Sequence, residues 1–349
     1  MKKIAVIPGD GIGRETVTEA LKVMDALSLP LQFDEFPFGA EYYLKTGKTL
    51  EDDDLEELKD FDAILLGAVG DPRVKPGILE RGILLKLRFH FDMYVNLRPA
   101  KLLDARFTPL KNKRDIDIVF VRENTEGLYA GSGGFLHKNT EYEVAIQEMI
   151  NTRRGVERIV RFAMEYARKK GRKKVTLCDK SNVLTYAHDL WQRVFWELGK
   201  RYEDIKKDHE YVDALAMKLV RSPERFDVIV TPNMFGDILT DLAAELTGGL
   251  GLAASGNINP EGLSMFEPVH GSAPDIAGKG MANPMATVLA VSMLLDFLGF
   301  EREAKVIEHA VSTALREGFL TPDMGGDKRT EEVGDYLARL VGGGEDVWF

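Results

Sequence analysis

The chain has 349 residues, 44% hydrophobic and 29% charged, a balance typical of a globular protein large enough for two lobes. The 56 acidic and 46 basic residues give a formal net charge of −10, which argues against nucleic acid as the main partner. No stretch approaches the roughly 20 apolar residues of a membrane span, and the apolar run 4–7 is too short for a signal peptide, so we expect a cytoplasmic protein.

Strand patterns rich in Val and Ile alternate with amphipathic helical patterns along the chain. Nearly continuous apolarity predicts buried parallel strands at 3–7, 61–67, 117–121, 175–179 and 226–231. Helical spacing predicts helices that include 15–27, 155–168 and 186–196, and mostly helices from Pro284 onward. This alternation predicts an α/β fold with right-handed crossovers. The glycine-bearing segment 129–142 lacks helical spacing and predicts a hairpin arm or a surface loop.

Three compositional features add weaker indications. The single cysteine, Cys178, cannot form an internal disulfide, and its apolar surroundings predict a core residue. The basic run 168–174 is interpreted as a solvated helix C-terminus favoured by the helix dipole, with phosphate or RNA binding as the alternative. Glutamine occurs only three times beside abundant Lys, Arg and Glu, which fits a thermophilic protein.

Two aspartates stand one helical turn apart after the predicted strand 226–231. A helix that begins near Gly236 places Asp237 and Asp241 on one face, at the strand end where open α/β sheets bind ligands. Carboxylates at this spacing suit Mg²⁺ or Mn²⁺; the alternative is a first helical turn whose acids face water. Asp213 opens another apolar helix and is either a dipole partner or a third ligand for the same ion.

Three arginines lie beside predicted strands. Arg88 and Arg98 flank the strand-like segment 93–97, and Arg122 follows the strand 117–121. An arginine at a buried strand end is costly unless an anion pairs with it. The three therefore predict a pocket that holds a dicarboxylate through bidentate contacts, and internal ion pairs are the alternative.

Lys180 directly follows the predicted strand 175–179. Burial and neighbouring cations can lower the pKa of such a lysine, so it could act as a base beside a tyrosine acid; a solvated surface lysine is the alternative. Two glycine-rich segments could meet a nucleotide. The segment 8–15 lacks the G-x-G-x-x-G spacing of an ordinary Rossmann fold. In 266–278, Asp275 could bind both ribose hydroxyls and repel a 2′-phosphate.

The segments 8–15, 122–129, 233–241 and 267–278 together resemble the β-decarboxylating dehydrogenases. This family includes the 3-isopropylmalate, homoisocitrate, isocitrate and tartrate/D-malate enzymes, and the resemblance covers essentially the whole chain. It implies a homodimer of two-lobed α/β subunits with the isopropylmalate/isocitrate dehydrogenase-like fold, which is distinct from the ordinary Rossmann fold. One lobe, residues 1–99 with 252–349, would bind NAD. The other, residues 100–251, would carry the dimer contact, the metal and substrate sites and an interlocking arm.

The resemblance also implies a role for each candidate residue. Arg88, Arg98 and Arg122 would clamp the malate carboxylates. Asp237 and Asp241, with Asp213 of the neighbouring subunit, would bind Mg²⁺ or Mn²⁺. Lys180 of the neighbour would be the base and Tyr129 the acid. The NAD surface would comprise Glu267, His270, Gly271, Ser272, Ala273, Asp275, Ile276 and Asn283.

The implied reaction is NAD-dependent oxidation of a 3-substituted malate followed by loss of CO₂. Leu84 and Leu85 resemble the pair that receives the isopropyl group of 3-isopropylmalate, whereas the segment 122–127 resembles the homoisocitrate, isocitrate and tartrate enzymes. We predict a pocket that serves leucine and lysine synthesis, in which Arg81 reaches the distal carboxylate of homoisocitrate. A tartrate/D-malate dehydrogenase is the alternative within the family. A non-catalytic dicarboxylate-binding module is the alternative outside it, although it would have no use for Lys180 and Tyr129.

Overall fold

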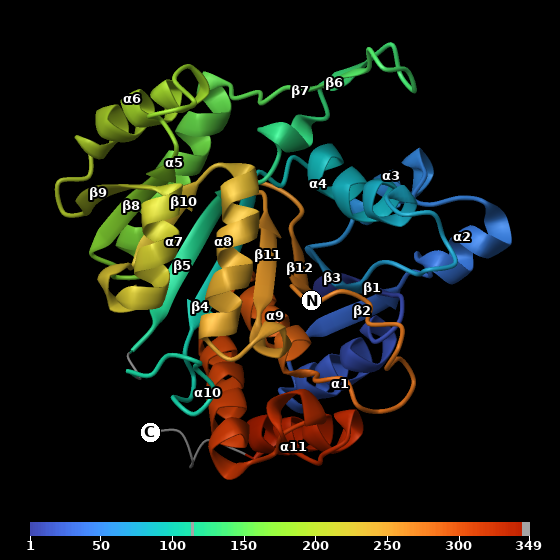
Figure 1. Ribbon diagram of the computed structural model, residues 1–349. Helices are drawn as coiled ribbons and strands as arrows, with labels where there is room; N and C mark the ends of the chain where they lie inside the picture. Colours follow the sequence, from blue (N-terminus) through green and yellow to red (C-terminus); the bar gives the residue numbers. More distant parts are fainter. Residues whose placement is uncertain (113–114, 344–349) are drawn as a thin grey trace. The chain divides into compact units, whose positions relative to one another are not determined.

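The computed structural model describes residues 1–112 and 115–343 (Figure 1). Its described residues form two compact units: unit 1 comprises 1–93, 102–112 and 244–343, and unit 2 comprises 94–101 and 115–243. The predicted lobes have their boundaries at 99/100 and 251/252, six and eight residues from those at 93/94 and 243/244, and residues 102–112 lie in unit 1 rather than in the second lobe. Residues 94–101 belong to unit 2 because β4 (Val95–Lys101) pairs with β5 (Asp117–Glu123) along its whole length.

Unit 1 is built around β1 (Lys2–Gly9), whose middle residues are buried, and the fully buried β3 (Ala63–Ala68), and these two strands pair in parallel. The strand order is β2-β1-β3-β12-β11. β2 (Leu31–Glu35) is parallel to β1 and β12 (Met265–Pro268) is parallel to β3, whereas β11 (Ala254–Ile258) is antiparallel to β12. The helical elements of unit 1 are α1 (Gly13–Ala26), α2 (Ala40–Thr46), α3 (Asp52–Leu58), η1 (Glu80–Leu85), α4 (Lys86–His90), η4 (Leu250–Leu252), α9 (Met285–Phe297), α10 (Glu301–Glu317), η5 (Pro322–Met324) and α11 (Thr330–Gly342).

Alternate residues of the central strands of unit 1 point to a common core. Ile7 of β1 and Ile64 of β3 are buried in one apolar cluster with Leu55 of α3 and Ile83 of η1. This packing fixes η1, the segment that carries the predicted substrate-tail residues, against the sheet of unit 1. The first and last long helices, α1 and α11, pack side by side, so both parts of the chain belong to the same unit (Figure 1).

Unit 2 has the strand order β4-β5-β10-β8-β9. β5, β10 (Val228–Thr231), β8 (Lys174–Asp179) and β9 (Lys206–Tyr211) are parallel, whereas β4 is antiparallel to β5. Its helical elements are η2 (Leu128–Ala130), α5 (Arg153–Lys169), α6 (Ala187–Gly199), α7 (Val212–Arg221), η3 (Pro223–Arg225) and most of α8 (Asn233–Leu246). A separate hairpin, β6 (Gly133–Leu136) with β7 (Val144–Gln147), lies wholly exposed.

The predicted α/β class is confirmed, and so are all five predicted strands and the three named helices. Two strand pairs, β4 with β5 and β11 with β12, are antiparallel rather than parallel. The segment 129–142, predicted as an arm or a loop, enters the β6–β7 hairpin. None of the helices in the described part of the chain is long and apolar enough to cross a membrane.

Two of the weaker sequence indications have structural answers in unit 2. Cys178 is fully buried in β8, as predicted, and burial raises the pKa of its thiol. The basic run begins at the C-terminal turn of α5, where Arg168 pairs with Asp204 at 2.6 Å. Arg172 pairs with Asp117 at 2.6 Å and lies 3.1 Å from Asp227. These arginines therefore already have acidic partners within their own unit.

Candidate active site

Two arginines, a tyrosine and two aspartates meet at one end of the parallel strands of unit 2. Arg122 lies in β5 level with Thr231, the last residue of β10, directly before α8 begins. Its guanidinium donates to Asp237 Oδ1 at 2.5 Å, and the Tyr129 hydroxyl donates to Asp237 Oδ2 at 2.7 Å. Arg122 also lies over the Tyr129 ring, 5.3 Å from its centroid. The carboxylate of Asp237 thus gathers a cation and a phenol, both predicted from sequence.

Arg98, on β4, reaches the same helix from the neighbouring strand. Its Nη1 donates to Thr240 Oγ1 at 2.7 Å and lies 3.4 Å from Asp241 Oδ1, while its Nη2 lies 3.6 Å from Asp237 Oδ1. The Arg98 side chain is only 10% exposed, whereas that of Asp241 is 59% exposed. Asp241 therefore keeps oxygens toward solvent at the edge of a buried cationic patch.

Asp237 and Asp241 lie one turn apart in α8, as the sequence predicted, although the helix begins three residues earlier than Gly236, at Asn233. Partial burial raises the pKa of Asp241, with Arg98 acting in the opposite direction and Asp237 adding to the rise. Two carboxylates held together at the cost of mutual repulsion match the oxygen donors that Mg²⁺ and Mn²⁺ prefer. The residue types therefore fit a divalent cation.

The third predicted metal ligand, Asp213, has a different neighbour in this chain. It lies in the first turn of α7, where its Oδ1 accepts a hydrogen bond from Lys180 Nζ at 2.6 Å. That hydrogen bond lowers the pKa of Asp213. Among the residues that the structure describes, no group of three His, Cys, Asp or Glu side chains is arranged to hold a metal ion within one chain. Asp213 accordingly does not join Asp237 and Asp241 here.

Lys180 itself is held at the carboxyl end of β8. Its backbone N–H donates to Nδ1 of the fully buried His188 at 2.8 Å, and its Nζ lies 5.7 Å from the Tyr211 ring centroid. The preceding residue, Asp179, is buried and accepts hydrogen bonds from Gln192 and Ser181. The lysine side chain is 24% exposed, so it is neither a free surface lysine nor fully enclosed.

The remaining predicted arginine, Arg88, belongs to unit 1. It is 5% exposed on α4, and its Nη2 donates to Glu267 Oε1 at 3.0 Å. Asn257 donates to the same oxygen at 2.7 Å, so Glu267 is a buried partner of Arg88 rather than an open surface group. Arg88 Nε is buried without a hydrogen-bond partner in the structure, which leaves one donor available to an anion.

The predicted tail residues Arg81, Leu84 and Leu85 lie on η1, a six-residue π-helix. Leu84 and Leu85 are half-buried, and Leu84 packs against the core of unit 1, whereas Arg81 is exposed. A Cβ at Gly82 would lie 2.5 Å from the Thr49 hydroxyl, so a side chain there would have to displace Thr49. π-Helical turns often occur at functional sites.

The loop after β12 carries most of the predicted NAD residues, also in unit 1. Nδ1 of His270 lies 3.0 Å from the Gly271 carbonyl, and its buried Nε2 has no partner. Burial lowers the pKa of His270, so the neutral ring can present Nε2 as an acceptor. No atom lies within 4 Å of a Cβ built at Gly271, and Asp275 is exposed. The orphaned acceptor and the open backbone fit a nucleotide at this loop.

Of the other predicted NAD residues, Ser272, Ala273 and Ile276 shape this loop, whereas Asn283 contacts Asp323. Ser272 is buried and its carbonyl accepts the Ile12 N–H at 2.8 Å, which joins the loop to the segment 8–15. Ala273 adopts φ +37°, and its carbonyl accepts the Ile276 N–H at 3.1 Å, so these residues form a tight turn. The buried Asn283 donates to Asp323 at 3.1 Å.

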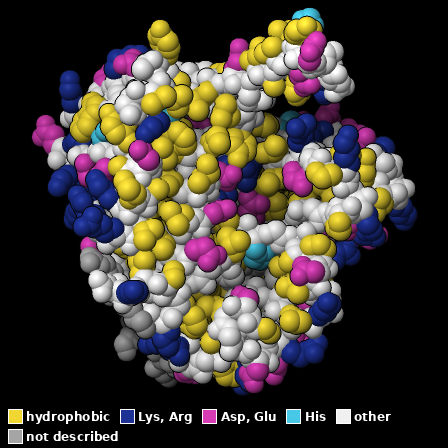
Figure 2. All heavy atoms as spheres, viewed as in Figure 1, with side chains coloured by type: hydrophobic (Ala, Val, Ile, Leu, Met, Phe, Trp, Pro, Cys, Tyr) yellow, Lys and Arg dark blue, Asp and Glu magenta, His cyan; other side chains and the backbone are white. Residues whose placement is uncertain are grey.

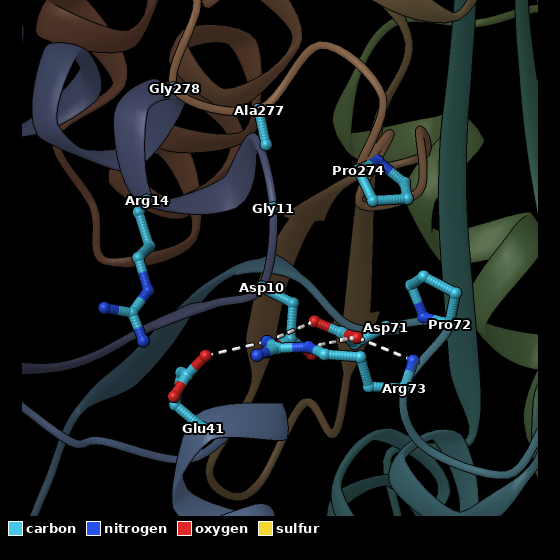
Figure 3. A pocket seen from close by; sticks show the side chains of 10 residues that line it. All are labelled: Asp10, Gly11, Arg14, Glu41, Asp71, Pro72, Arg73, Pro274, Ala277 and Gly278. Atoms are coloured by element: carbon cyan, nitrogen blue, oxygen red, sulfur yellow. Dashed lines mark hydrogen bonds and ion pairs between the residues drawn. The ribbon is translucent and has the colours of Figure 1, made fainter.

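A pocket of about 790 Å³ opens beside this loop within unit 1 (Figure 3). Arg73 spans it, pairing with Asp71 and with Glu41 at 2.7 Å each. The buried Asp10 accepts N–H groups from Ala40 and Gly70, which ties together the loops around the pocket. Its lining residues are Asp10, Gly11, Arg14, Glu41, Asp71, Pro72, Arg73, Pro274, Ala277 and Gly278.

Sequence reasoning missed several residues that shape the site. Asn233, which is 1% exposed, accepts two hydrogen bonds from Arg122 through Oδ1, at 3.1 and 2.8 Å. His188 supports Lys180 from α6, and Thr240 binds Arg98. An Asn before a helical pattern indicates a helix cap, so only the spacing of Asn233 four residues before Asp237 could have suggested a role on the same face.

The comparisons with known proteins agree with one another. The family of isocitrate/isopropylmalate dehydrogenases matches residues 3–337. A 3-isopropylmalate dehydrogenase of Streptomyces coelicolor is 56% identical, covering 97% of this chain and 98% of its own. The chain belongs to the isocitrate/isopropylmalate dehydrogenase family. A second 3-isopropylmalate dehydrogenase, from Thermobifida fusca, is 54% identical, with 97% of each chain covered.

Solved structures of this dehydrogenase family share the fold over the full chain. An isocitrate dehydrogenase from Methylococcus capsulatus has a TM-score of 0.90 at 40% identity, covering 98% of this chain and all of its own. A β-decarboxylating dehydrogenase from Thermococcus kodakarensis has a TM-score of 0.84 at 39% identity, covering all of this chain and 99% of its own. The predicted family and its two-lobed fold are thereby confirmed, and the protein is an enzyme of this dehydrogenase family.

Proposed function

We propose that the enzyme oxidises and decarboxylates 3-isopropylmalate with NAD and a divalent cation, as a step of leucine synthesis. The observation that carries this proposal is the cluster of Arg98, Arg122, Tyr129, Asp237 and Asp241, which combines anion-binding, cation-binding and proton-donating groups. The names of the relatives that are more than 50% identical favour 3-isopropylmalate among the possible acids.

Charge balance in unit 2 supports a site for a cation and a dicarboxylate together. The two arginines and two aspartates pair with one another, and their formal charges sum to zero. If a divalent cation takes the carboxylates, the guanidinium groups become available for a doubly charged anion, and the sum stays at zero. Within unit 1, Arg88 keeps its buried Nε without a hydrogen-bond partner, so it is a further candidate donor to a carboxylate.

The chain also offers groups for the two proton transfers. Lys180 Nζ, once it has released its proton, can take the proton of the 2-hydroxyl group. The Tyr129 hydroxyl, which here donates to Asp237, can later protonate the enol carbon left after CO₂ departs. Asp237 and Asp241 would hold a divalent cation, which would stabilise, as a Lewis acid, the negative charge that develops on the substrate oxygen.

We infer that Lys180 and Asp213 serve the site of a second subunit in a homodimer. Within one chain, Asp213 pairs with Lys180, and among the described residues it forms no three-ligand group with Asp237 and Asp241. This supports a site that Asp213 completes from another subunit. Apolar side chains gather over α7 and α8 on the face seen in Figure 2. Among the apolar residues of these two helices, Met217 of α7 is 68% exposed and Ile238 of α8 is 57% exposed. The β6–β7 hairpin adds further exposed apolar residues, including Phe135 and Leu136. A second copy of the chain is the partner we propose for these surfaces.

NAD is the cofactor that the loop after β12 favours, because the exposed Asp275 would repel a 2′-phosphate. We expect Asp275→Lys to lower the ratio of kcat/KM for NAD to that for NADP by about 10²-fold, from loss of the ribose contacts and of the repulsion. Asp25→Lys, which makes the same change at an exposed residue of α1 in the same unit, is the control. An unchanged NAD/NADP ratio in the Asp275 variant would argue against this role.

The half-buried leucines of η1 support a branched alkyl tail, and the exposed Arg81 on the same element supports a longer acid with a distal carboxylate. We therefore expect Arg81→Ala to lower kcat/KM for homoisocitrate by about 10-fold or more, and for 3-isopropylmalate by less than about twofold. Steady-state rates with both acids measure this difference. Equal losses on the two substrates would remove Arg81 from the tail site.

One assay tests the proposal as a whole: NADH formation from 3-isopropylmalate, homoisocitrate, isocitrate, D-malate and tartrate, with and without EDTA. We expect 3-isopropylmalate to react with the highest kcat/KM and EDTA to abolish the rate, with recovery on adding Mg²⁺ or Mn²⁺. Full activity in EDTA would contradict the metal site. Absence of NADH with every acid would contradict a dehydrogenase and favour a binding module.

A further inference from the structure

We propose that Glu126 is a positioning residue for Tyr129 and that its side chain takes no part in choosing the substrate tail. The inference rests on the proposed function, because it assumes that Tyr129 is the acid. It also explains why the segment 122–127 resembles that of homoisocitrate-type enzymes while η1 resembles that of isopropylmalate enzymes. The observation behind it is that both carboxylate oxygens of Glu126 are engaged by the start of α5.

The contacts between Glu126 and α5 form an extended helix cap. Thr152 is the N-cap of α5, and its Oγ1 accepts the N–H of Gly155 at 2.9 Å. Glu126 Oε2 accepts the N–H of Thr152 at 2.8 Å, and Oε1 accepts its hydroxyl at 2.5 Å. The Thr152 hydroxyl thus donates to Glu126 while it accepts from Gly155, so the Glu126 carboxylate is fixed relative to the first turn of α5.

Gly155 provides the space for this arrangement. A Cβ built at Gly155 would lie 2.3 Å from the carboxyl carbon of Glu126. A side chain at 155 would therefore push the carboxylate off Thr152. The position of the Glu126 carboxylate therefore depends on Thr152 and on the absence of a side chain at Gly155. These are packing contacts within the protein rather than contacts with a substrate.

The backbone of Glu126 is tied to the site by a second route. Its carbonyl accepts a hydrogen bond from Asn233 Nδ2 at 3.2 Å, and the same side chain accepts two hydrogen bonds from Arg122 through Oδ1. Asn233 is the first residue of α8, the helix that carries Asp237. Glu126 therefore links the start of α5 to the start of α8 beside the arginine of the cluster.

The residues around Glu126 leave the approach to Tyr129 little freedom. The buried Glu123 accepts the Thr125 N–H, the Thr125 hydroxyl and the Glu126 N–H, at 2.9, 2.8 and 2.8 Å. Gly127, at φ +74°, then exchanges two backbone hydrogen bonds with Ile150. Two residues later the Tyr129 hydroxyl reaches Asp237. Freeing Glu126 would loosen this segment between its two fixed ends, and a displacement near 1 Å can cost about 10²-fold in rate.

The test compares Glu126→Ala with Glu126→Gln, whose amide oxygen can still accept from Thr152. Glu157→Ala is the matched control, because Glu157 is an acid of α5 that pairs with Arg153 at 2.6 Å, outside the Glu126 cap. Values of kcat and KM are measured for 3-isopropylmalate and for the second acid that the wild-type enzyme turns over fastest, together with the pH profile of kcat.

We expect Glu126→Ala to lower kcat by about 10-fold or more for both acids, with the ratio of their kcat/KM values kept within about twofold. The alkaline limb of the pH profile should move, since it reports the acid in the enzyme–substrate complex. Glu126→Gln should recover most of kcat, and Glu157→Ala should match the wild type. A change in the substrate ratio of about 10-fold, or an unchanged kcat in Glu126→Ala, would overturn the inference.

Hydrogen exchange gives a readout that is independent of activity. The amides of residues 127–129 should exchange faster in Glu126→Ala than in the wild type, and at the wild-type rate in Glu157→Ala. If the wild-type enzyme oxidises none of the acids, the proposed function fails, while the exchange rates still decide whether Glu126 anchors the segment. Unchanged exchange in Glu126→Ala would reject the anchor.

Discussion

Lys180→Met is expected to lower kcat by about 10²–10⁴-fold, the range typical of losing a general base. The methionine keeps most of the volume of the side chain but cannot take a proton. The local fold should survive, because His188 binds the backbone of residue 180 and not its ammonium group. Rates of NADH formation at saturating substrate measure the loss. Lys200→Met, at an exposed position after α6, is the control that removes one positive charge elsewhere.

Mixed dimers test whether Lys180 serves the neighbouring site. If Lys180 of one subunit works with Tyr129 of the other, Lys180→Met and Tyr129→Phe chains that assemble together form one intact site in each mixed dimer. Random assembly then restores about one quarter of the wild-type activity. Activity no higher than that of either parent would place both residues in the same subunit or exclude one of them from catalysis.

Asp241→Asn is expected to lower kcat/KM by about 10³-fold, since losing an anionic ligand of a Lewis-acid cation costs several kcal/mol. The substitution keeps the shape of the side chain, and Arg98 keeps its hydrogen bond to Thr240, so α8 should remain in place. The amide oxygen is a weaker ligand than the carboxylate. Raising the Mn²⁺ concentration should therefore recover part of the rate.

Glu245→Gln is the matched control for the metal site, because it makes the same change one turn further along α8 at an exposed residue. Titration of Mn²⁺ by electron paramagnetic resonance measures the affinity directly. The Asp241 variant should bind Mn²⁺ more weakly, and the Glu245 variant should bind as the wild type does. Equal affinity in all three proteins would remove Asp241 from the metal site, even if activity falls.

The strands that sequence analysis found and missed differ in their surroundings. β5 and β8 lie between other strands, so their side chains are apolar on both faces and the pattern is nearly continuous. β9, with the sequence KKDHEY, ends the strand order of unit 2 and needs few apolar residues. The antiparallel direction of β4 could not be predicted from the sequence either, because strands of both directions pair through backbone groups that every residue carries.

The candidate site shows the same limit at the level of single residues. Arg122 and Asp237 could be predicted because Arg122 lies near the end of the strongly patterned β5 and Asp237 lies near the start of α8. The buried pair of Arg88 with Glu267 joins positions 179 residues apart, and no local pattern encodes it. The resemblance of the segment 122–127 to other enzymes of the family points to the substrate, and no local pattern predicts that Glu126 contacts Thr152, 26 residues further along the chain.

The β6–β7 hairpin has a consequence for how the enzyme behaves on dilution. A ribbon of two strands with every residue exposed is marginal by itself in water, so it needs a covering surface to persist. If that surface is another subunit, order in the ribbon obeys mass action: it grows as subunits meet and declines as they part. The concentration of the protein would then determine what fraction of the hairpins is ordered and, with it, what fraction of the sites has both subunits in place.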